Sequence, residues 1–174
     1  AGFTHWAKLN NLKQAAKTMN FLTEHGISSY GELESKLTAV SARRDTAHAE
    51  IKRIESRSAE LALVMKHAGT YRQLKPLYER YRKSNDKEKF LRGHESEIIL
   101  FEAAARELKR LGAVPLPTTE SMKTELANLN AEKERLLTEF KTTRTETQEY
   151  DTVKQNVDAL LAVPKEQEQQ RRHE

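Results

Sequence analysis

Basic side chains gather in one stretch of the sequence, residues 66–92. This stretch has nine lysines and arginines against three acids, a balance of +6. The rest of the chain has the other 21 basic and 23 acidic side chains, a balance of −2. A local basic patch is typical of a surface that meets a polyanion, because lysine and arginine neutralise phosphates and release counterions. The candidate DNA-binding residues are Arg72, Lys75, Arg80, Arg82, Lys83, Lys87, Lys89 and Arg92.

Aromatic side chains lie among these basic residues, at Tyr71, Tyr78, Tyr81 and Phe90. Exposed rings of this kind could stack on unpaired bases. The three tyrosines also recur at helical spacing, which is typical of a packed helix face. Protein contact and a merely solvated charged face are further interpretations of the stretch, and the residues alone leave all of them open.

The remaining reactive side chains form no recognisable catalytic or metal-binding pattern. The run HESEI at residues 94–98 begins like the zinc-protease helix motif, but Ile98 stands where the second histidine ligand belongs. The six histidines are scattered, and the chain has no cysteine. We therefore predict no catalytic residue, no cofactor and no metal in this chain, and we do not expect it to be an enzyme by itself.

Two heptad stripes predict the elements that position the basic stretch. In each stripe the steps alternate between three and four residues without a slip, which is typical of a coiled-coil seam. The second stripe includes lysine or threonine at four places, and such residues weaken packing but can fix register. The first stripe is Tyr30, Leu33, Leu37, Val40, Arg44, Ala47, Ile51, Ile54, Ser58, Leu61, Met65 and Ala68. The second is Met122, Leu126, Leu129, Lys133, Leu136, Phe140, Thr143, Thr147, Tyr150, Lys154, Val157 and Leu161.

Shorter patterns predict two more helical regions. Residues 4–24 read as a helix, and the residues between 70 and 111 read as shorter helices. The inward face predicted for the first is Trp6, Leu9, Leu12, Ala16, Met19 and Leu22. The face predicted between Gly93 and Gly112 is Ile98, Phe101, Ala105 and Leu108.

Glycine, proline and capping residues predict where the helices begin and end. We expect breaks at Gly26, Gly69, Gly93 and Gly112 and a kink or restart at Pro76. Starts are expected at the Ser29–Glu32 and Asn85–Glu88 pairs and at Thr118 or Thr119, and Pro164 is expected to end the last helix. The predicted divisions are residues 1–28, 29–69 (first coiled-coil helix), 70–117 (head), 118–163 (second coiled-coil helix) and 164–174 (disordered tail).

Composition and patterning together predict an all-α fold. Hydrophobic residues make up 37% and aromatic residues 6% of the 174 residues, which suits helices that each bury a narrow stripe. We predict a long antiparallel coiled-coil hairpin with a small basic helical head, and with the first helix packed at the open end. The alternative is a parallel dimer in which each long helix pairs across two chains.

Three blocks of the sequence resemble a known family. WAKLNNLKQAAKTMNFLTEHGISSYGELE (6–34), the block at 70–109 and EYDTVKQNVDALL (149–161) are similar, in this order, to segments of relaxases. These are the mobilisation nucleases of Gram-positive conjugative or mobilisable elements, and the similar segments follow their nuclease domain. The most specific block contains Lys75-Pro76, Tyr78, Tyr81-Arg82 and the run 94–97.

The resemblance implies a C-terminal region of a relaxase, and we expect this chain to be a piece of a larger protein. Relaxases nick DNA through a tyrosine aided by a metal on a histidine cluster. That cluster is not found in this sequence, so no tyrosine is assigned as a nucleophile. The expected role is non-catalytic support of DNA binding or processing in the cytoplasm, without membrane insertion. The alternative is a coiled-coil scaffold for dimerisation or for docking to a coupling protein of the transfer machinery.

Overall fold

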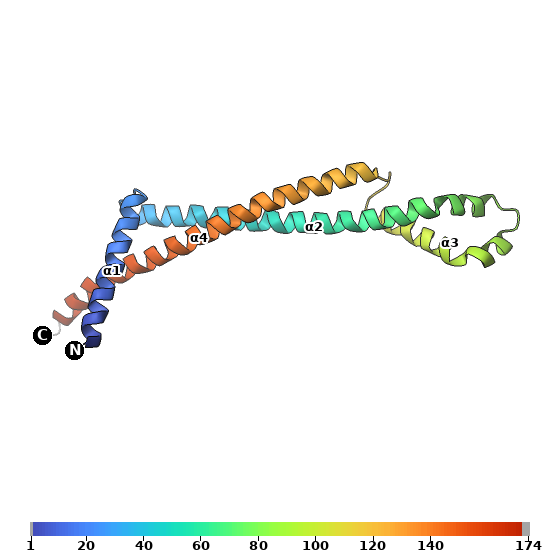
Figure 1. Ribbon diagram of the computed structural model, residues 1–174. Helices are drawn as coiled ribbons and strands as arrows, with labels where there is room; N and C mark the ends of the chain where they lie inside the picture. Colours follow the sequence, from blue (N-terminus) through green and yellow to red (C-terminus); the bar gives the residue numbers. More distant parts are fainter. Residues whose placement is uncertain (1, 172–174) are drawn as a thin grey trace. The chain divides into compact units, whose positions relative to one another are not determined.

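The residues that the structure describes fold into four α-helices and contain no strand (Figure 1). The computed structural model describes the backbone of residues 2–171 and the side chains of residue 8 and of residues 10–162. The helices are α1 (Gly2–Glu24), α2 (Tyr30–Lys83), α3 (Lys87–Arg110) and α4 (Thr119–Arg171). The predicted all-α hairpin is confirmed. The chain divides into unit 1, residues 1–49 with 136–174, and unit 2, residues 50–135.

In unit 1 the beginning of α2 pairs with the end of α4. The Tyr30 hydroxyl donates to Asp158 Oδ1 at 2.7 Å, and Arg43 Nη2 lies 3.7 Å from Glu139 Oε1. Residue numbers rise along α2 as they fall along α4, so the pairing is antiparallel and lies within one chain. The buried cluster contains Ile27, Leu33, Val40, Tyr150 and Val153, with Val157 packed against it.

Unit 2 repeats this antiparallel arrangement and adds α3. Lys133 Nζ lies 2.8 Å from Glu55 Oε1, and Arg57 Nε donates to Glu125 Oε1 at 2.7 Å. Leu129 packs against the buried cluster that contains Leu61, as the heptad pattern predicts. The members of that cluster are Leu61, Val64, Ala68, Leu108, Ala113 and Met122.

The two threonines of the second heptad stripe are buried, and the hydroxyl of each has a hydrogen-bond partner. Thr143 and Thr147 are buried, with 0% and 3% exposure. Their hydroxyls donate to carbonyl oxygens one turn earlier in α4, Glu139 O at 2.8 Å and Thr143 O at 2.7 Å. Because the hydroxyls bond within their own helix, the methyl groups are free to pack in the seam.

Helix α1 packs against α4 as predicted, but through a different face. Thr18 is 1% exposed and its hydroxyl lies 3.2 Å from Asn156 Nδ2, while the Phe21 ring meets Tyr150 edge-on at 5.1 Å. Leu12 and Met19, predicted to point inward, are 66% and 57% exposed. The prediction was wrong because α1 contacts its neighbours only along a narrow face, and the large Phe21 ring occupies it. The side chains of Trp6 and Leu9 lie outside the described residues.

Gly26 and Gly112 end α1 and α3 as predicted. Both have left-handed φ values, +61° and +68°, which glycine adopts without steric cost. The amides that follow bond back to carbonyls five residues earlier, Ile27 N to Leu22 O at 2.8 Å and Ala113 N to Leu108 O at 2.9 Å. These are Schellman motifs, and they place the buried Ile27 and Ala113 against the core.

The helix starts agree with the capping patterns in two cases and differ in one. Ser29 Oγ accepts from Glu32 N at 3.2 Å, and Thr118 Oγ1 accepts from Ser121 N at 3.1 Å. The start of α3 was predicted at Asn85, but Asp86 is the cap, because its carboxylate accepts from Lys89 N at 3.0 Å.

The break predicted at Gly69 is wrong, and no helix restarts at Pro76, since α2 continues through both to Lys83. Ala68 is buried and Tyr71 is partly buried, so packing on either side of Gly69 outweighs its weak helix propensity. Pro76 is exposed and removes one amide donor, while Leu77 and Tyr78 beyond it are partly buried. The first coiled-coil helix therefore extends beyond residue 69 into the head.

Of two further predicted boundaries, one is confirmed and one is wrong. The break predicted at Gly93 is confirmed as a kink, because His94 has non-helical φ and ψ of −141° and 24°. The end predicted at Pro164 is wrong, since α4 continues to Arg171. Extending a long helix is less costly than nucleating one, and this favours continuation past a proline. Of the tail predicted at 164–174, the backbone of residues 164–171 is helical, and residues 172–174 lie outside the described residues.

Candidate nucleic-acid interface

The end of α2, a short turn and the start of α3 position the basic stretch. Ser84 N donates to Tyr81 O at 3.2 Å, and the Ser84 hydroxyl donates to Asp86 O at 3.1 Å. With the Asp86 cap on α3, these bonds hold the turn between two basic helix segments. The head, residues 70–117, thus presents both segments from one tight connection within unit 2.

The aromatic side chains of the head pack on one another rather than projecting to solvent. Tyr71 and Tyr78 stack on Phe101, with ring centroids 4.8 Å and 4.2 Å apart. Tyr81 lies 6.0 Å from Phe90. The four aromatic side chains of this stretch are all half-buried, so their rings form the core between α2 and α3. Of the two interpretations that the spacing left open, the packed helix face agrees with the structure.

The eight candidate DNA-binding side chains are all exposed: Arg72, Lys75, Arg80, Arg82, Lys83, Lys87, Lys89 and Arg92. Arg72 also makes hydrogen bonds within the protein, because its guanidinium donates to Thr119 Oγ1 at 2.6 Å and to the carbonyl of Pro117. It thereby fastens the end of the head linker to α2. Arg80 lies over the Phe90 ring, 5.8 Å from the centroid.

Two arginines away from the turn between α2 and α3 behave differently, because carboxylates neutralise them. Arg57 donates to both Glu60 and Glu125 at 2.7 Å, and these hydrogen bonds, led by Glu125, raise the pKa of Arg57. Arg110 lies 2.8 Å from Glu107, whose pKa its hydrogen bond lowers. No comparable ion pair of the eight head residues is found in the described part of the chain. Their charge is therefore presented to solvent.

Metal-ligating side chains do not cluster in the residues described. Within them no group of three or more histidine, cysteine, aspartate or glutamate side chains could hold a metal ion. His94 Nδ1 lies 3.7 Å from Glu97 Oε2, a single contact within one helix. None of the helices in the described range is both long enough and apolar enough to cross a membrane.

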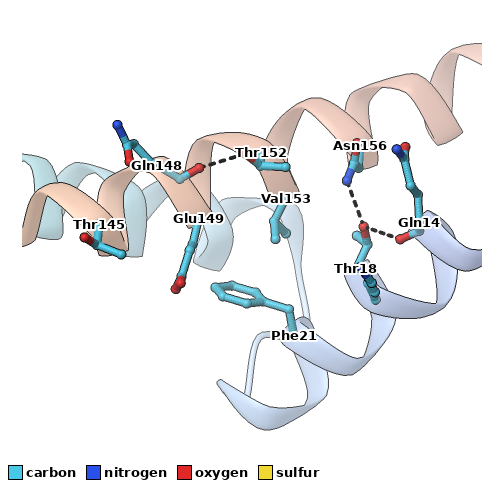
Figure 2. Close-up of a pocket in the computed structure, with 10 residues that line it drawn as sticks. Gln14, Thr18, Phe21, Thr145, Gln148, Glu149, Thr152, Val153 and Asn156 are labelled. Carbon is cyan, nitrogen blue, oxygen red and sulfur yellow. Dashed lines mark hydrogen bonds between the residues drawn. The ribbon is translucent and has the colours of Figure 1, made fainter. Parts of the chain in front are cut away.

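A groove between α1 and α4 in unit 1 was not predicted from the sequence. Its volume is about 470 Å³. Phe21 and Val153 are among the residues that line it (Figure 2). Some of its polar groups bond to one another, as the Thr18 hydroxyl does to Gln14 O at 2.9 Å and the Thr152 hydroxyl to Gln148 O at 2.9 Å. No local pattern marks the groove, because the face of α1 that lines it is not the apolar one.

Comparison of the chain with protein-family models, with curated proteins and with solved structures finds no match.

Proposed function

We propose that this chain is a non-catalytic accessory region of a relaxase, and that its helical head contacts DNA during conjugative transfer. The observation that carries the DNA contact is the set of exposed basic side chains held on a packed aromatic core. The relaxase assignment rests on the sequence blocks at 6–34, 70–109 and 149–161.

The way in which the head contacts DNA follows from which of its side chains are exposed and which are packed on one another. The rings are engaged with one another, so base stacking contributes little, and the basic groups neutralise phosphates. Phosphate contacts position a protein without reading bases, so binding is weak and tolerant of sequence. Release of counterions makes the affinity fall steeply as salt rises.

The test is a charge-removal variant in which Arg80, Arg82, Lys83 and Lys87 are all changed to Ala. We expect weaker binding of a DNA duplex and a salt dependence that is shallower by up to about four, roughly one for each phosphate that the variant no longer neutralises. Fluorescence anisotropy at a series of salt concentrations measures both quantities. An unchanged helical circular dichroism spectrum shows that the head remains folded.

The matched control removes four exposed lysines elsewhere, at positions 13, 52, 123 and 141. It lowers the net charge equally, and we expect most of the parent affinity to remain. If the two variants lose affinity to the same extent, the contact is a property of net charge and not of the head. Absence of any DNA binding by the parent protein at low salt contradicts the proposal itself.

A protein-docking scaffold is the second candidate, and one observation favours it. Ile99 and Leu100 on α3 are 54% and 55% exposed, which suits contact with another protein. Dimerisation through the heptad stripes has less support, because in each unit those stripes already bury one another. A docking role predicts a partner whose affinity changes little with salt and falls on Ile99→Glu.

A further inference from the structure

The apolar stripe of α1 lies largely on the surface of unit 1. Leu12 and Met19 are 66% and 57% exposed, and Ala16 between them is exposed as well. Leu22 continues the stripe and is half-buried. Residues spaced by three and four lie on one side of a helix, so these side chains form a single exposed face.

Residues of α1 and of the later part of α4 together line two hollows. One, of about 330 Å³, has Met19, Leu22 and Leu161 among its lining residues. The other, of about 190 Å³, has Ala15 and Leu160 among its lining residues. Leu160 and Leu161 are themselves 48% and 57% exposed. Apolar side chains of the two helices thus border two depressions that can receive side chains, and Asn11, Gln14 and Asn156 also line the smaller one.

The acidic side chain of α1 is its last residue, Glu24, and the charged side chains before it are lysines. Lys8, Lys13 and Lys17 are exposed, and residues 2–23 contain no aspartate or glutamate. The carboxylate of Asp158, bonded to Tyr30 beside the larger hollow, is already compensated by Lys154 Nζ at 3.2 Å. A second copy of α1 against the first would bring lysines to face lysines, which is unfavourable.

We propose that this surface, formed by Leu12, Ala16, Met19 and Leu22 of α1 with Leu160 and Leu161 of α4, docks an amphipathic helix flanked by acidic side chains. Such a helix inserts apolar side chains at three- and four-residue spacing into the hollows, and its carboxylates meet the lysines of α1. This inference is independent of DNA contact, because the surface lies in unit 1 and the head lies in unit 2.

The probe is a synthetic three-heptad peptide with leucine at helical spacing and glutamate at the remaining positions. Its counterpart carries lysine in place of every glutamate. We expect the acidic peptide to bind at least about tenfold more tightly than the basic one, and Leu12→Glu with Met19→Glu to reduce its binding at least about tenfold. Fluorescence anisotropy of labelled peptide measures both.

The matched control is Leu63→Glu with Val114→Glu, two exposed apolar side chains of unit 2, and it should leave peptide binding unchanged. Equal binding of the two peptides, or equal loss in the two double variants, overturns the proposal. So does self-association in sedimentation that Met19→Glu abolishes, because the surface would then serve a second copy. The peptide comparison uses the unaltered protein, so it decides the matter even if a variant fails to fold.

Discussion

Single side chains at the helix ends show how local contacts tune charge in this protein. The Tyr30 hydroxyl donates to Asp158 at 2.7 Å, and this hydrogen bond is the main cause that lowers the pKa of Asp158, with Lys154 adding to it. A carboxyl group whose pKa is lowered by folding stabilises the fold above its unfolded pKa. That contribution is lost as the pH falls through the folded pKa.

Tyr30→Phe removes the hydroxyl and keeps the ring. We expect the pKa of Asp158 to rise toward its ordinary value and acid unfolding to begin at a higher pH. Carboxyl carbon chemical shifts, followed by NMR through an acid titration, measure the pKa directly. The pKa of Glu107, which Arg110 lowers in the other unit, serves as the control and should stay where it is. An unmoved Asp158 would show that Lys154 alone holds its charge.

At the scale of elements, backbone geometry decides what a glycine contributes. Gly69 lies inside α2, and Gly26 ends α1 with φ at +61°. An added methyl group would meet nothing within 4 Å at either position. The two sites therefore differ in backbone conformation and not in available space.

Gly69→Ala should stabilise the protein by about 0.5–1 kcal/mol, because alanine is the better helix former and the unfolded chain loses freedom. Gly26→Ala should destabilise it by about 1 kcal/mol, because a side chain at positive φ is strained. Urea unfolding followed by circular dichroism measures both free energies. Shifts of the same sign in the two variants would contradict this account of the helix ends.

At the scale of the whole molecule, the sequence predicted the seams well and the boundaries less well. Ile54, Leu61, Met122 and Leu136 are buried where the heptads place them, because both stripes remain in step over many turns. Gly69 and Pro76 led to wrong boundaries, since packing against α3 is a long-range effect that local propensity does not contain. The exposed face of α1 was missed for the same reason.

The sequence also predicted one part of the candidate site and not the other. Charge is additive along a sequence, so the basic patch could be identified without a structure. Whether the tyrosines stack on bases or on one another depends on Phe101, which lies more than twenty residues further along the chain. The bonds of Arg72 to Thr119 and Pro117 also join distant residues, and no local pattern marks them.

The antiparallel pairing of α2 with α4 also sets the order in which the chain folds. Contacts of unit 2 close short loops, with 47 residues between Arg72 and Thr119, whereas Tyr30 and Asp158 in unit 1 are 128 residues apart. The longer closure costs about 1 kcal/mol more in chain entropy, so unit 2 should form first and unit 1 should follow. In stopped-flow experiments Val64→Ala should then slow refolding, while Leu33→Ala should mainly speed unfolding. The reverse assignment would place the folding nucleus in unit 1.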